Sequence, residues 1–338
     1  MRHIAPLLKI HMFFYIIIFS IVTILPVISH GRSMPTKSII ARFVTSKDTY
    51  CLGEPIPVNF SIENTSSNDI HFIIGNLPQN DFLFSAKDEH GRSISAQKGR
   101  CAGDEWSPMI KLAPSCLYRR QLILNKYLLF KNVGTYTVKC EIHTPFMKVA
   151  DGLQKSDGDE VNACQEITIR IEPFDLTSLR ATATELVSLL TSPDTTTRHE
   201  AAEALSMFPQ EVGSSYLSQA LDSSDPVVRA HAVRGVAQYK GTDGVRFLKS
   251  AAVATDETTR MEILAGLRQV GNVDKSTSLE ILGGFLKDKN ARIRRTAIGV
   301  LANIEDTRRL QLLERMTEDP DSGVRVTAVR TLEILRKK

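Results

Sequence analysis

The sequence predicts a two-domain protein in which an all-β sandwich is followed by an all-α solenoid of five helix pairs. Two observations predict this class. Between residues 36 and 173 apolar side chains alternate with polar ones, which is the period of strands with one buried face. Between residues 176 and 338 the apolar period becomes that of a helix, and one motif recurs five times.

An uncharged apolar run precedes both predicted domains. Residues 12–25 are almost wholly apolar, and Arg2 and Lys9 come before them. This order is typical of a secretory signal, so residues 1–31 are predicted to be a signal peptide and the protein to be exported, either periplasmic or secreted. An uncleaved membrane anchor is the alternative, although this run would span only about 21 Å of a hydrocarbon core about 30 Å thick.

The charge distribution argues against nucleic acid as a partner. The formal net charge is +4, and Arg2, Lys9 and Arg32 supply three of these charges in a segment without acidic residues. The remainder of the chain is therefore close to neutral. It lacks the positive field that binding to a phosphate backbone requires.

The first domain is predicted to contain about seven strands separated by turn residues, as in a two-sheet sandwich. Val58, Phe60 and Ile62 are one alternating set, and Ile167, Ile169 and Ile171 are another. Two segments, LGEPIPVNFSIEN at 52–64 and GTYTVKC at 134–140, resemble immunoglobulin-like modules. Because the tyrosine stands four residues before the cysteine and no tryptophan lies on a central strand, the resemblance is to the broad immunoglobulin-like class.

All five cysteines fall in this domain, between residues 51 and 164. An oxidising compartment would favour two disulfides and one remaining thiol, and the pairs nearest in sequence are Cys101–Cys116 and Cys140–Cys164. Five cysteines permit fifteen such arrangements, so the pairing stays open. The cysteines have no zinc-type spacing, which argues against a metal site built on sulfur.

The second domain is defined by a repeated acidic–basic pair. The five copies are Asp194 and Arg198, Asp225 and Arg229, Asp256 and Arg260, Asn290 and Arg294, and Asp321 and Arg325. Successive arginines are 31, 31, 34 and 31 residues apart. A small or apolar residue follows each arginine by three positions and a leucine or valine by seven, and a leucine precedes each Asp or Asn by eight.

Helix physics accounts for this pattern. The aspartate is predicted to cap a second helix in each repeat, the small residue to allow close packing, and the leucines to fill a core shared between repeats. The pattern resembles short HEAT-like repeats of the phycobilisome-lyase type. That resemblance implies that the Asp/Arg pairs form a ladder of hydrogen bonds between neighbouring repeats. Asn290 and Ile263 depart from the pattern, so packing is expected to be weaker there.

Motifs for catalysis are missing from the sequence, which contains no HExxH, GxSxG, GxxxxGK[ST] or GxGxxG segment. The segment RHEAAEAL at 198–205 resembles deoxyhypusine hydroxylase, a HEAT-like di-iron enzyme. Only one His-Glu pair, His199-Glu200, is present, whereas such a centre needs several. We therefore expect no catalytic residue, cofactor or metal. An enzyme or ligand site in the sandwich loops, with His71, His90 and His143 close together, is the alternative.

A basic patch marks the fourth repeat, where Lys287, Lys289, Arg292 and Arg295 lie within nine residues. It could attract an acidic protein, an anionic polysaccharide or a lipid surface; solvated helix ends are the alternative. The sequence as a whole predicts an exported, non-catalytic scaffold that binds another protein of the cell envelope. The short connection around Pro173 predicts that the two domains act as one semi-rigid unit.

Overall fold

The fold is described by a computed structural model covering residues 39–74, 81–96, 109–150, 153–155, 160–253 and 256–337; side chains are described outside 143–162. The predicted signal peptide, residues 1–31, and Cys101 lie outside these ranges. Within them, no helix combines the length and the apolar character that crossing a membrane requires.

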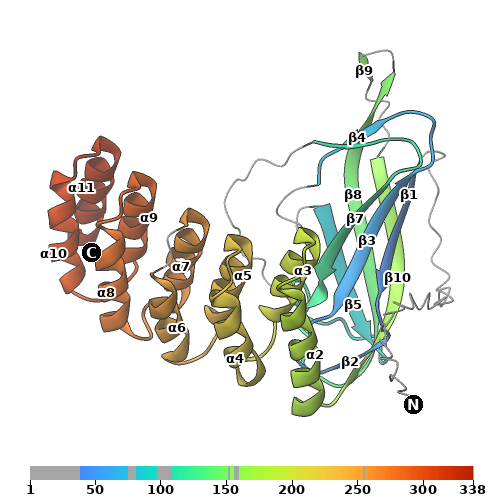
Figure 1. The fold of residues 1–338 in the computed structure, drawn as a ribbon, viewed down its shortest axis with the longest axis horizontal. Coiled ribbons are helices and arrows are strands. Elements are labelled where there is room, and N and C mark those ends of the chain that lie inside the picture. Colours follow the sequence, from blue (N-terminus) through green and yellow to red (C-terminus); the bar gives the residue numbers. More distant parts are fainter. Residues whose placement is uncertain are drawn as a thin grey trace, which may run out of the picture.

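The strand-rich region consists of two sheets (Figure 1). Its strands are β1 (Ile39–Thr45), β2 (Thr49–Cys51), β3 (Pro57–Asn64), β4 (Ile70–Phe72), β5 (Phe82–Asp88), β6 (Ile110–Leu112), β7 (Leu117–Ile123), β8 (Gly134–Ala150), β9 (Leu153–Lys155) and β10 (Glu160–Glu172), with a 3-10 turn at Leu124–Lys126. One sheet has the order β1-β3-β7. The other has the order β2-β10-β8-β4-β6, and β5 and β9 also pair with β8.

The two sheets share one apolar core. The predicted alternation on β3 buries Val58, Phe60 and Ile62, and the rings of Phe60 and Phe82 meet edge to face across the sheets at 4.9 Å. The region has more strands than the seven predicted, and β8 is 17 residues long. Its far end, beyond the part paired with β5, carries the short strands β4 and β9.

The candidate pair Cys140–Cys164 does not form a disulfide in the structure. In the register of β8 and β10, Cys140 stands opposite Gln165 and Cys164 stands opposite Glu141. The two cysteines are therefore on opposite faces of the sheet, and Cys140 is buried while Cys164 is exposed. All four described cysteines, Cys51, Cys116, Cys140 and Cys164, are free. Burial raises the pKa of the Cys140 thiol.

The helical region contains five helix pairs within the described residues (Figure 1). The first helices are α2 (Leu176–Leu189), α4 (Gln210–Leu221), α6 (Asp243–Ala251), α8 (Lys275–Phe285) and α10 (Arg308–Arg315, followed by a 3-10 turn at Met316–Glu318). The second helices are α3 (Thr195–Leu205), α5 (Pro226–Val236), α7 (Glu257–Val270), α9 (Ala291–Leu301) and α11 (Ser322–Arg336). The 34-residue step is explained by α7, which has 14 residues where α3, α5 and α9 have 11.

Each second helix begins at the Asp or Asn that the repeat alignment selected. Each of these side chains accepts a hydrogen bond from a backbone N–H two or three residues ahead, which satisfies one of the free donors at a helix start. The caps and their donors are Asp194 with Thr197 (2.7 Å), Asp225 with Val227 (2.9 Å), Asp256 with Thr259 (2.7 Å), Asn290 with Arg292 (2.9 Å) and Asp321 with Val324 (2.9 Å).

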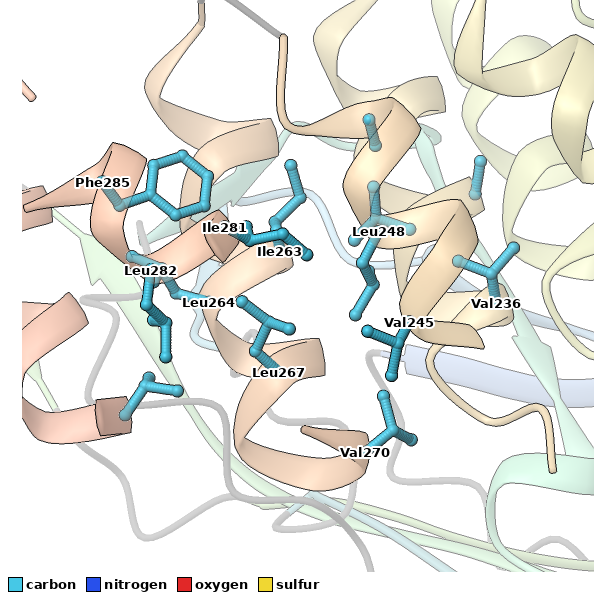
Figure 2. Packing of buried hydrophobic residues seen from close by; sticks show 14 of the residues in the cluster. Val236, Val245, Leu248, Ile263, Leu264, Leu267, Val270, Ile281, Leu282 and Phe285 are labelled. Carbon is cyan, nitrogen blue, oxygen red and sulfur yellow. The ribbon is translucent and has the colours of Figure 1, made fainter. Parts of the chain in front are cut away.

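A continuous apolar core joins the helix pairs. Figure 2 shows Leu248 of α6 and Leu267 of α7 within this core, together with Leu282 of α8. These are the leucine positions of the predicted repeat. Each pair leaves one apolar side uncovered and the next pair covers it, so the array depends on stacking.

The second helices form the tighter row of the array. The helices α3, α5, α7, α9 and α11 contact one another closely in succession, whereas in the described part of the chain the first helices make their closest successive contacts at α2–α4 and α6–α8. An array that is tighter on one row curves toward it, so the second helices, called the inner row below, line its inner side. In Figure 1 the sandwich extends on that same side.

Stacking leaves no room for a side chain at Gly235 on α5, where an added Cβ would stand 2.7 Å from Leu217 Cδ1 and 2.9 Å from Ser206 Cα. We predict that Gly235→Ala lowers the free energy of unfolding by about 1–3 kcal/mol. The matched control is Gly283→Ala on α8, where nothing lies within 4 Å. This change should raise stability by about 0.5–1 kcal/mol. Urea denaturation measures both, and equal effects would contradict the packing described.

Candidate protein-interaction surface

The repeated arginines link neighbouring repeats. Arg198 donates from Nε and Nη2 to Asp225 Oδ2 of the next repeat at 3.2 and 3.1 Å. In the same way Arg229 donates from Nη2 to Asp256 Oδ2 at 2.6 Å. Asp225 and Asp256 therefore act twice, as the cap of their own helix and as the partner of the preceding arginine.

The next two steps use a different acceptor. Arg260 pairs with Asp288 at 3.2 Å, and Arg294 donates from Nε and Nη2 to Asp319 at 2.8 Å each. Asp288 and Asp319 stand two residues before the caps Asn290 and Asp321. Asn290 carries no charge, so the carboxylate of Asp288 takes its place. Asp321 keeps its charge, and Arg294 nevertheless pairs with Asp319.

The ladder lies inside the array. Arg294 and Asp319 are both buried, and Arg325, in the last described repeat, donates to the carbonyl oxygens of Asp319 and Pro320 at 2.8 and 3.0 Å. Hydrogen bonds within and between helix pairs occupy these guanidinium groups. The ladder residues therefore stabilise the array and leave its surface chemistry to other side chains.

The sandwich contacts the first helix pair. Lys126, in the 3-10 turn after β7, forms an ion pair with Glu203 of α3. Gln121 of β7 donates to the Glu200 carbonyl at 3.5 Å, and Thr182 of α2 donates to Glu54 at 3.4 Å. A pocket of about 270 Å³ lies at this junction between the two domains. Its lysine, Lys47, is already paired with Glu54 at 2.5 Å.

A chain of charges continues from this junction along the inner row. Glu203 faces His231 of α5, and Arg234 of α5 forms an ion pair with Glu262 of α7. Burial acts to raise the pKa of Glu203, but the charge of Lys126 and its hydrogen bond outweigh burial, and the pKa is lowered. Burial together with Arg234 lowers the pKa of His231 to about 3. His231 is therefore neutral at physiological pH.

Sequence reasoning did not identify these residues. Lys126 and Glu203 are 77 positions apart and belong to different domains. The repeat alignment nevertheless contained a signal for these pairs. Glu203 and Arg234 each follow their repeat arginine by five residues, and His231 and Glu262 each follow theirs by two. Opposite charges in these columns indicate the pairing of neighbouring helices.

The structure brings no metal-binding group together among the described residues, where no three His, Cys, Asp or Glu side chains cluster. His199 Nε2 lies 3.1 Å from Asp225 Oδ2, so its ring is engaged in the ladder. The histidine cluster considered in the sandwich does not form. The strand of His71 meets β8 at Met147 and the strand before His90 meets it at Tyr136, eleven residues or roughly 36 Å away. The side chain of His143 lies outside the described side chains.

The predicted basic patch divides between two places. Lys287 and Lys289 are exposed in the turn between α8 and α9, whereas Arg292 and Arg295 are exposed on the inner row. Arg292 lies 3.4 Å from Glu257 of α7. The four residues of the predicted patch are thus exposed side chains on a turn and on the first turns of the helix that follows it.

The geometry defines a strand-rich domain joined to an α-solenoid. The family model described as HEAT repeats matches residues 214–282 and 267–333. The part of the helical region between residues 214 and 333 is accordingly similar to HEAT repeats. None of the curated proteins compared with this chain is a significant match.

Several solved structures are similar at low identity. The complex of CpcE and CpcF of phycocyanin lyase from Nostoc sp. PCC7120 is 20% identical, with a TM-score of 0.37, over 45% of this chain and 98% of that one. A designed armadillo repeat protein in complex with the peptide (KR)4 is 18% identical, with a TM-score of 0.34, over 47% and 84%. A HEAT-like repeats protein from Thermococcus onnurineus is 15% identical, with a TM-score of 0.26, over 49% and 98%.

The double role of Asp225 gives a first test. Asp225→Ala removes a helix cap and the partner of Arg198, and we predict a loss of about 2–3 kcal/mol in the free energy of unfolding. Asp194→Ala is the control, because Asp194 caps α3 but follows no earlier repeat arginine; it should cost clearly less stability than Asp225→Ala. Urea denaturation compares the two. Equal losses would show that the Arg198 pair contributes nothing.

His231 gives a second test. Its folded-state pKa of about 3 lies below the ordinary 6.5, so the unfolded chain binds more protons between these values and stability falls as the pH drops. Going from pH 7 to pH 5 should cost up to about 2 kcal/mol through this residue. His231→Gln should lose correspondingly less over the same interval, measured by urea denaturation. Identical losses in the two proteins would contradict the assignment. The charged and titratable residues around position 231, which are Glu203, Lys126, Arg234 and His199, are the same in the original protein and in His231→Gln.

Proposed function

We propose that this protein is an exported, non-catalytic scaffold that binds another protein of the cell envelope along the inner row of its HEAT repeats. HEAT repeats are generally protein-interaction scaffolds, because stacked helix pairs present an extended curved surface. The observation that carries the proposal is the unbroken succession α3, α5, α7, α9 and α11 beside the sandwich. A partner bound there would meet several repeats at once.

The sandwich belongs to the proposal as an immunoglobulin-like domain. Two features support this class. Its two sheets share one core, and the Tyr136 hydroxyl, near the start of a late strand, donates to the Asn132 carbonyl at 2.9 Å. A tyrosine that bonds back to the backbone a few residues upstream is typical of immunoglobulin-like folds. Export rests on residues 1–31, with their charged start and apolar run.

Site-specific photocrosslinking tests which row binds. A photoreactive residue replaces Gln269 on the inner row or Gln219 on the first helix α4; both glutamines are exposed. We expect a specific protein to be crosslinked in the native cell envelope from position 269 and not from position 219. Capture from position 219 alone, or equally from both, would contradict binding along the inner row.

A further inference from the structure

Two arginines of the inner row have no acidic partner among the described residues. Arg268 on α7 and Arg295 on α9 are exposed, and neither lies within ion-pair distance of a carboxylate that the structure describes. Arg268 Nη2 lies 3.8 Å from the point where a Cβ would stand on Gly299 of α9. Arg295 Nη1 lies 3.2 Å from the equivalent point on Gly323 of α11. Each arginine therefore extends from its own helix onto the next one.

The remaining charges of the inner row are arranged differently. Near the sandwich the acidic groups are neutralised, because Glu203 pairs with Lys126 and Glu262 pairs with Arg234. Toward the far end Arg330 of α11 is exposed and has no acidic partner among the described residues, and the exposed acid on the same helix is Glu333. Arg268, Arg295 and Arg330 form what is called the arginine strip below. The inner row is thus balanced beside the sandwich and cationic beyond it.

We propose that the arginine strip binds an acidic segment of a partner protein. The proposal deepens the function proposed above and rests on it. A guanidinium group presents paired N–H donors that match the two oxygens of a carboxylate, and hydrogen bonds between charged groups are stronger than neutral ones. Arginines left unpaired on a rigid helical surface are ready to make these bonds without first breaking an internal ion pair.

The surroundings of the strip favour a protein chain over a membrane. The strip lies on the inner side of a curved array, and a flat bilayer cannot follow an inward-curved surface. Between the arginines the exposed residue Ala265 is small. An extended segment can therefore approach the helices closely while its carboxylates reach the guanidinium groups on either side. Lys287 and Lys289, in the turn between α8 and α9, lie outside this strip.

Binding of defined peptides to the full chain tests the proposal. Fluorescence anisotropy would measure a labelled peptide of alternating glutamate and serine, with a glutamine–serine peptide as the uncharged counterpart. We expect the glutamate peptide to bind, more weakly as salt rises, and the glutamine peptide not to bind. The double variant R268E/R295E should weaken binding at least about tenfold.

The control is R180E/R315E. It makes the same change of charge on the first helices α2 and α10, at exposed arginines outside the inner row. Its affinity should stay within about twofold of the original protein if the strip is the site, because screening weakens the effect of distant surface charges. Thermal unfolding of both variants checks that they fold. Equal weakening by the two variants would overturn the proposal, because it would show that peptide affinity depends on the net charge of the protein and not on the arginine strip.

Two further outcomes separate this proposal from the general function. Binding to anionic phosphatidylglycerol vesicles, lost in R268E/R295E, without binding of the glutamate peptide would overturn the acidic-segment proposal in favour of a lipid surface. If R268E/R295E still crosslinks the same partner from position 269 with unchanged yield, the acidic-segment proposal fails and the scaffold function stands. If no partner is crosslinked from that position in the original protein, the scaffold function itself fails.

Discussion

The apolar contact between successive helix pairs is the interaction on which the rest of this structure depends. Each pair has an apolar side that only its neighbour covers, and leucines such as Leu217 and Leu267 are completely buried in the process. Close approach is needed as well, and Gly235 shows how close, because Ser206 and Leu217 occupy the space of a side chain there. This packing holds the second helices side by side, so their outward residues form one continuous row.

Charged residues have separate roles according to their position relative to that core. The ladder arginines point between repeats, where Arg294 and Asp319 are buried together, and they contribute to stability. The charges on the inner row face outward and differ along its length. Beside the sandwich, Glu203 pairs with Lys126 and Arg234 pairs with Glu262. Farther along, Arg268 and Arg295 have no acidic partner among the described residues. One architecture therefore carries two different surface chemistries.

The sandwich also has a structural role at the start of the array. A terminal repeat has no neighbour on one side, and solenoids need a cap that covers the exposed apolar surface. Cys51 packs against the helical core, and Gly53, with a φ of 90°, brings the backbone close to the ring of Pro209. Lys126 adds an ion pair to α3. These contacts connect the two domains directly and place the inner row beside the sandwich.

The sequence by itself determined where the second helices begin and which residues fill the core. A cap such as Asp225 or Asn290 acts on a backbone group two residues away, and the period of buried leucines follows helix geometry, so both are local. Only the tertiary structure decided which carboxylate each arginine meets, on which side of the sheet Cys140 and Cys164 lie, and that Lys126 reaches Glu203. These outcomes depend on how separate elements are placed against one another. A shift of one residue in register, or of two along a turn, changes the partner while leaving the local periodicity the same.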